Sequence, residues 1–334
     1  MVRHLLPALC LALPLSCWSQ TEAPMPAAAA SEAAPETILL VGQRPGPGLW
    51  KVSKGDHVLW VFGMYAPLPE KMEWRSQQVE AIVAQSQEFL LPPGAHANIG
   101  FWRGLTLLPG LIGVKKNPDG ATLRDILPAD VYARWQPLKA RYLGKDDGIE
   151  RERPIFAAQT LYQAGLKQAG LTNSGAVRAK VDAIVRQHKV KTTETAIKLD
   201  IDNAARALSD FKKSALADTA CFDKTLARLE TDIEAMRVRA NAWAKGDIAA
   251  IRQLSYPDQD SACDDAVLGA DFVKNQPGWQ NVKQRAQDAW LAAAERSIGS
   301  NDTSFAILGL AEILGPGGYL TALQARGYQV DSPE

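Results

Sequence analysis

Two apolar runs that end in glycine stand near opposite ends of the chain. Residues 57–63 read His-Val-Leu-Trp-Val-Phe-Gly, and residues 304–309 read Ser-Phe-Ala-Ile-Leu-Gly. Short runs of this kind, rich in β-branched and aromatic residues, predict buried strands. Because such strands bury both faces only inside a covered sheet, the pattern predicts one sheet that is built from both ends of the chain.

Shorter patterns extend this prediction. Residues 48–52, followed by a turn at Gly55-Asp56, predict a hairpin with residues 57–62, and further short strands are predicted at 88–91 and 328–330. Residues 64–69, with two prolines, predict a loop. Apolar residues spaced by three or four predict helices in residues 76–86, 154–169, 174–188, 195–217, 222–244, 248–254, 277–297 and 319–325. The expected fold is α+β: a mixed β-sheet from the N- and C-terminal segments, covered by a large helical insert at about residues 123–300.

The amino terminus has the order of a secretory signal peptide. A weakly basic start is followed by apolar residues 5–15 and by small residues up to Ser19, so residues 1–19 are predicted to be cleaved near Ser19. The protein is then periplasmic or secreted. The alternative is a lipoprotein acylated at Cys17, but Pro14 stands where a Leu-like residue is required. Residues 20–36 are low-complexity and predict a disordered linker, which leaves residues 37–334 as a single domain.

Charge, hydropathy and cysteine content limit the possible binding partners, membrane spans and crosslinks of the chain. The chain has 37 basic and 37 acidic residues, and this balance gives no footprint for nucleic acid. No segment after the signal peptide has about 18 apolar residues in a row, so no membrane span is expected. In an oxidising compartment Cys221 and Cys263 predict a disulfide that adds about 3–4 kcal/mol of stability in the chain-entropy model. Two buried free thiols are the alternative.

Both ends of the chain resemble one protein family. Leu49-Trp50-Lys51-Val52, the run through Gly63 and the later Met72-Glu73-Trp74-Arg75-Ser76 resemble the opening of the TraB/GumN family, which includes Tiki-type proteases. Residues 305–309, 315–318 and 326–330 resemble its closing motif, and Arg153-Pro154 fits its central part. The resemblance spans about residues 48–331. It implies a Gly-x-x-His motif at the end of each of the two strands, whose histidines, with acidic partners, hold a divalent metal that activates water for peptide hydrolysis.

This chain departs from the family pattern at the implied ligands. The first motif reads Gly63-Met64-Tyr65-Ala66, with alanine in place of histidine, and the second reads Gly309-Leu310-Ala311-Glu312. The acidic residue implied after the third strand falls near Pro92. Because a methyl group and a proline ring cannot bind a metal ion, these motifs predict a degenerate site with no cofactor and no metal.

Other residues could compensate for this loss only in part. His96 follows the third strand and could form half a site with Glu312, while Glu88 and Glu194 are the remaining acidic candidates. His57 is expected in the hairpin turn at the far end of its strand, and His188 at the polar end of a helix. The weak catalytic candidates are therefore Glu312, His96, Glu88 and Glu194.

Three hypotheses of function follow. The first is a catalytically degenerate TraB/GumN-like protein, a pseudoenzyme, with a binding or structural role in the cell envelope, in which Met64 and Tyr65 could line a cleft for a peptide or glycan. The second is a peptidase or other hydrolase with an altered site and a divalent metal. The third is an interaction protein of the envelope, which rests on analogy alone. A peptide or an envelope component is the expected partner.

Overall fold

The computed structural model describes residues 47–333 apart from short gaps at 73, 99–105, 202, 215, 254–258, 275 and 277. All structural statements below concern these described residues. The signal peptide and linker predicted for residues 1–36 lie outside them.

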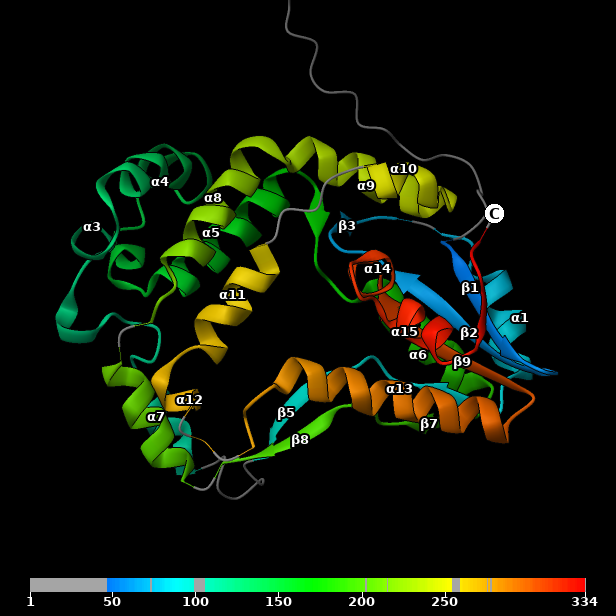
Figure 1. Ribbon diagram of the computed structural model, residues 1–334. Coiled ribbons are helices and arrows are strands. Elements are labelled where there is room, and N and C mark those ends of the chain that lie inside the picture. The colour runs from blue at the N-terminus through cyan, green and yellow to red at the C-terminus, as the bar shows by residue number, and fades with distance from the viewer. Residues whose placement is uncertain are drawn as a thin grey trace, which may run out of the picture. The chain divides into compact units, whose positions relative to one another are not determined.

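A six-stranded sheet unites the two ends of the chain (Figure 1), in the order β10-β1-β2-β9-β4-β7. Strands β2, β9, β4 and β7 run parallel, whereas β1 is antiparallel to β2 and β10 is antiparallel to β1. The strands are β1 (Leu49–Lys54), β2 (His57–Met64), β4 (Glu88–Leu90), β7 (Lys191–Thr193), β9 (Thr303–Gly309) and β10 (Gln329–Asp331). The predicted mixed sheet from both chain ends is confirmed.

The hairpin of β1 and β2 forms where the turn residues predict it. Gly55 has φ +60°, a conformation that favours glycine because it has no Cβ. The register pairs Lys54 with His57 and Leu49 with Phe62, and β2 then pairs with β9 from Val58 to Met64. The apolar runs singled out in the sequence therefore lie side by side in the middle of the sheet.

Helices cover both faces of this sheet. Phe305 on one face stacks with Phe62 and Phe89, and Arg178 of α6 (Ala176–Gln187) lies over the Phe89 ring. On the other face the Ser304 hydroxyl contacts Ser297 of α13 (Val282–Ser300) at 2.8 Å. Successive strand residues point to opposite faces, so α6 and α13 lie on opposite sides. Three more helices pack into this core: α1 (Gln77–Gln85), α14 (Leu310–Leu314) and α15 (Tyr319–Ala325).

A second apolar core lies within the helical insert. Its centre is Trp135 of α4 (Ala129–Tyr142), whose ring is 5.3 Å from that of Phe222 in α8 (Thr219–Thr231). A disulfide joins Cys221 of α8 to Cys263 of α11 (Gln259–Leu268), as predicted. This part of the chain also contains η2 (Pro118–Gly120), α3 (Leu123–Ile126), η3 (Gly148–Arg151), α5 (Pro154–Gln168), α9 (Ile233–Lys245), α10 (Ile248–Gln253) and α12 (Asp271–Lys274).

Three local predictions were wrong. The helix expected at 195–217 is the strand β8 (Ile197–Asp200), which pairs with β5 (Ala95–Asn98), followed by the shorter α7 (Ala204–Lys213). The helix expected at 222–244 is broken at Asp232 into α8 and α9. The loop expected at 64–69 contains β3 (Leu68–Pro69), which pairs with β6 (Leu171–Thr172). In two of these cases the cause is a long-range strand pairing that local spacing does not encode.

Among the described residues, no helix is both long and apolar enough to cross a membrane.

Candidate functional site

The carboxyl ends of the parallel strands bring the predicted site positions to one edge of the sheet. Met64 at the end of β2 pairs with Gly309 at the end of β9, and Leu90 at the end of β4 pairs with Ala306 of β9. Ligand sites of sheets with parallel strands commonly lie at this edge. The segments that begin at Tyr65, Leu310, Leu91 and Glu194 all leave the sheet here.

Gly63 shapes the end of β2 because the backbone is tightly enclosed there. A Cβ atom at this position would lie 2.5 Å from Cζ3 of Trp50 and 2.7 Å from Cδ2 of Leu310. The Gly63 carbonyl also accepts a hydrogen bond of 2.8 Å from the buried indole N–H of Trp243 on α9. The glycine of the first motif thus has a packing role that does not depend on the identity of residue 66.

Beyond Gly63 the chain turns one side chain inward and the next outward. Tyr65 is buried, whereas Ala66 is exposed and presents only its methyl group. Burial raises the pKa of the Tyr65 phenol, against a hydrogen bond and the positive charge of Arg239. Tyr65 therefore belongs to the packing under the edge and does not line an open cleft.

The partner of Tyr65 is part of a buried ion pair that the sequence analysis did not single out. The Arg239 guanidinium donates two hydrogen bonds to the Asp232 carboxylate, at 2.8 and 2.9 Å, and its side chain is 2% exposed. Bidentate pairs of this kind have a fixed geometry. The sequence does contain a pattern that could have predicted this pair. Arg239 lies on α9 between the buried Met236 and Trp243, and it follows Asp232 by seven residues.

Glu312, which replaces the second histidine, folds back onto its own helix terminus. Its Oε2 atom accepts a 2.7 Å hydrogen bond from the Gly309 backbone N–H, at the start of α14. Burial raises the pKa of Glu312, and the Gly309 hydrogen bond only partly offsets this. The carboxyl thus works first as a cap for the short helix α14.

The Tyr319 phenol lies near this carboxyl. Burial raises the pKa of the Tyr319 phenol, and the charge of Glu312 raises it further. The Tyr319 ring meets the Trp290 ring edge-on at 5.3 Å, and the buried Trp290 indole N–H has no hydrogen-bond partner within the described part of the chain. The turn before α15 is equally tight, because a Cβ at Gly318 would lie 2.7 Å from the carbonyl oxygens of Glu312 and Ile313.

The third strand end carries no free acidic side chain toward this edge. The hydroxyl of buried Thr195 lies 2.9 Å from the carbonyl oxygens of both Leu91 and Pro92, and so fixes the segment after β4. Glu194, the preceding residue, is exposed. Pro92 therefore contributes a backbone carbonyl that Thr195 already engages.

Glu88 lies at the other end of the strands. It begins β4 beside Ser304, and its carboxylate accepts hydrogen bonds from Thr193 (2.5 Å), Lys191 (3.0 Å) and Asn301 (3.0 Å). Burial alone would raise the pKa of Glu88, but hydrogen bonds from Thr193, Ser297 and Lys191, together with the Lys191 charge, lower it to about 2. Both oxygens of this carboxylate accept hydrogen bonds. Glu88 and Glu312 lie at opposite ends of the parallel strands.

The histidines are also dispersed. His96 is exposed on β5, where it pairs with Lys198 of β8 in a separate two-stranded ribbon. The Nδ1 atom of His57 lies 2.7 Å from the Asn301 carbonyl oxygen, at the amino end of β2. His188 follows α6 and lies 3.8 Å from a Glu80 oxygen. No contact in the described residues links His96 to Glu312.

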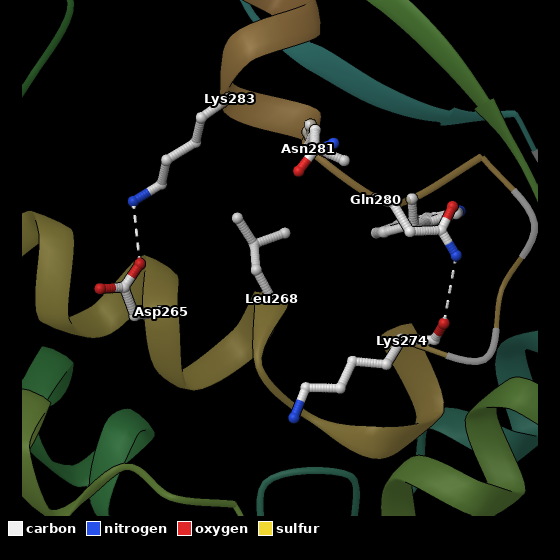
Figure 2. A pocket seen from close by; sticks show the side chains of 8 residues that line it. Asp265, Leu268, Lys274, Gln280, Asn281 and Lys283 are labelled. Carbon is white, nitrogen blue, oxygen red and sulfur yellow. Dashed lines mark hydrogen bonds and ion pairs between the residues drawn. The ribbon is translucent and has the colours of Figure 1, made fainter.

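A cavity of about 370 Å³ lies elsewhere, against α11, α12 and the start of α13 (Figure 2). At one side of it Lys283 meets Asp265 at 3.1 Å, and the Leu268 side chain beside this pair points into the cavity. Burial alone would lower the pKa of Lys283, but Asp265 and Asp264 raise it. None of the predicted site residues lines this cavity.

The architecture now defines the class of protein: an α+β domain with two glycine-ended parallel strands at its centre and a helical insert between them. The model of the TraB/PrgY/gumN family matches residues 48–332, so the chain belongs to this family. No curated protein and no solved structure matches it.

The residues at the strand edge do not fit the divalent metal that the family resemblance implies. Ala66 and Pro92 have no side-chain donor, and the one carboxyl of the two motifs, Glu312, is held by the Gly309 N–H. In the part of the chain that the structure describes, no three His, Cys, Asp or Glu side chains are grouped so that they could hold a metal ion. No step through a metal is therefore derived for this chain.

Proposed function

We propose that this member of the TraB/PrgY/gumN family is an exported protein of the cell envelope that has lost metal-dependent hydrolysis and serves a binding or structural role. The observation that carries the proposal is the donor set at the strand edge: a methyl group at residue 66, a proline at residue 92 and a helix-capping carboxyl at residue 312. Losing outer-shell partners alone typically weakens a metal site 10–100-fold, so losing the ligands costs more.

The backbone packing around residues 66, 92 and 312 supports the idea that the fold is kept for a role other than hydrolysis. Gly63 and Gly318 keep the close backbone packing at the edge, and the Tyr65–Arg239–Asp232 network stiffens it from below. The Cys221–Cys263 disulfide supports an oxidising compartment. A stable edge without metal ligands suits recognition of a peptide or an envelope component.

Metal titration of paired variants tests the proposal. Calorimetry with Zn²⁺ should give no stoichiometric binding for the wild type. The double variant Ala66→His, Glu312→His restores both imidazoles of the family motif and should gain measurable affinity. Thermal melts of both proteins establish that each is folded. Tight one-to-one binding by the wild type would overturn the proposal.

One observation favours an alternative, a hydrolase with an altered site. Glu312 is a partly buried carboxyl at a strand edge whose pKa is raised by burial, and these are properties of a general acid. Tyr319 lies close to it. Peptidase profiling with and without a chelator tests this idea. Glu312→Gln should abolish any activity, and Glu70→Gln, an exposed carboxylate that is not a site candidate, should leave it unchanged. Activity that persists in a Glu312→Ala, His96→Ala double variant would remove the alternative.

A further inference from the structure

Three exposed aliphatic side chains cluster in and just after the 3₁₀-helix η1 (Leu108–Leu111). Leu108 is 56% exposed, Leu111 46% and Ile112 77%, and these three residues are called the aliphatic patch below. Elsewhere in the described chain the large exposed apolar side chains, Ile126 and Val238, stand singly. Single exposed apolar residues are ordinary, but a cluster of them marks an interaction surface.

The aliphatic patch is held outward by a well-packed support. Nζ of Lys212, near the end of α7, donates hydrogen bonds to the carbonyls of Ile112 (2.8 Å) and Gly110 (3.3 Å). Leu208 of α7 packs so closely on Gly110 that a Cβ there would lie 2.9 Å from its Cδ2 atom. The backbone of the segment is thus held against α7 by Lys212 and Leu208.

A buried arginine locks this support in place. Arg153, 1% exposed, donates hydrogen bonds to the carbonyl of Lys116 after the patch and to those of Phe211, Lys212 and Ser214 at the end of α7. Its guanidinium also lies over the Phe211 ring at 4.6 Å. The patch is therefore presented by rigid structure and not by a chain end.

Positive charge accompanies the aliphatic patch. Residues 89–118 contain no Asp or Glu, and exposed Lys115 and Lys116 follow the patch directly, with exposed Lys213 on α7. The facing acidic groups are few: Glu152 lies 3.7 Å from Lys116, and Asp210 lies 3.7 Å from Arg206. Lys115, whose Nζ lies 5.9 Å from the centre of the Phe156 ring, and Lys213 are both exposed.

We propose that the aliphatic patch docks this protein on the surface of an anionic phospholipid bilayer. Leu108, Leu111 and Ile112 enter the interface between headgroups and acyl chains, while Lys115 and Lys213 meet the phosphate headgroups. The composition favours lipid over a protein partner, because protein hot spots are rich in Trp, Tyr and Arg and poor in Leu. The proposal does not depend on the fate of the metal site.

Vesicle co-sedimentation of the full mature chain tests the proposal. The wild type should pellet with vesicles of phosphatidylcholine and phosphatidylglycerol at least about tenfold better than with phosphatidylcholine alone. The variant Leu108→Ser, Leu111→Ser, Ile112→Ser should lose at least about tenfold in binding. The matched control Ile126→Ser, Val238→Ser removes exposed aliphatic residues elsewhere and should bind like the wild type. A second variant, Lys115→Gln, Lys213→Gln, should lose the preference for anionic lipid.

The following results would overturn the proposal of membrane docking. Wild-type protein that does not bind anionic vesicles, or a triple serine variant with normal melting that binds them equally well, would contradict it. A wild-type oligomer that the triple variant lacks, without vesicle binding, would assign the aliphatic patch to contacts between copies of the chain instead.

Discussion

Glu88, which is buried, and Glu312, which is partly buried, show how local surroundings set the role of a residue in this protein. Hydrogen bonds from Thr193, Ser297 and Lys191, with the Lys191 charge, outweigh burial and lower the pKa of Glu88 to about 2. Burial raises the pKa of Glu312, which accepts one backbone hydrogen bond. Both residues were site candidates on sequence grounds. In the structure Glu88 lies at the start of the parallel strands and Glu312 caps the helix that follows their finish.

Glu88 should contribute pH-dependent stability. Its pKa in the folded state, about 2, lies below the unfolded value near 4.3, so its stabilisation is complete above about pH 5 and is lost as the pH falls from about 4 to 2. Glu88→Gln should cost about 2–3 kcal/mol at pH 7 and almost nothing at pH 2. Urea unfolding at several pH values measures this difference. Glu194→Gln, an exposed carboxylate, should change stability by less than about 0.5 kcal/mol; an equal loss in both variants would contradict the assignment.

At the level of secondary-structure elements, Asp232 lies at the break between α8 and α9. Its carboxylate holds the buried Arg239 guanidinium, which in turn contacts Tyr65 at the strand edge. Asp232→Ala should cost about 3–5 kcal/mol, since it leaves a buried charge uncompensated.

The matched control for Asp232 is Glu234→Ala in the same helix. Glu234 pairs with Arg237 at 3.2 Å on an exposed surface, and such pairs contribute about 0–1 kcal/mol. Thermal unfolding of the two variants compares them directly. Similar small losses in both would mean that the Asp232–Arg239 pair does not support the edge.

The disulfide joins the insert helices α8 and α11. Cys221→Ser, Cys263→Ser should lower the free energy of unfolding by about 3–4 kcal/mol, because the unfolded chain regains loop freedom. Wild-type protein unfolded under reducing conditions should behave in the same way. A variant as stable as the oxidised wild type would show that the crosslink does not constrain the unfolded chain.

Prediction from sequence succeeded for elements whose signals are local. The hairpin of β1 and β2 follows from alternating apolar residues around Gly55, and α15 from spacing between Gly318 and Gly327. The pairing of β5 with β8 was not predicted because residues 95–98 are all exposed and carry no apolar run. The break between α8 and α9 was not predicted either. In the sequence Asp232 is typical of a solvent-exposed helix residue, and only the structure shows that it pairs with Arg239.

The same distinction holds for the candidate site. The glycine-ended runs predicted which strand ends meet, and Met64 and Gly309 are paired in the sheet. The inward turn of Tyr65 and the capping of α14 by Glu312 depend on contacts with α9 and on the tight Gly318 turn. Such contacts join residues far apart in sequence or need backbone geometry, so a single sequence does not contain a direct signal for them.

At the scale of the whole molecule, the chain keeps the TraB/PrgY/gumN frame while the positions of the implied ligands have changed. A sheet built from both chain ends requires the helical insert to fold between them, and two separate apolar cores stabilise these parts. The fold can therefore persist when the residues at its edge no longer support chemistry.

The most direct test of this account is the metal content of the mature protein after export in cells grown with ordinary trace metals. Elemental analysis of the purified chain should find transition metal far below one atom per chain, and the same low level after dialysis against chelator. One tightly held atom per chain, lost only with chelator and with a drop in melting temperature, would contradict the account.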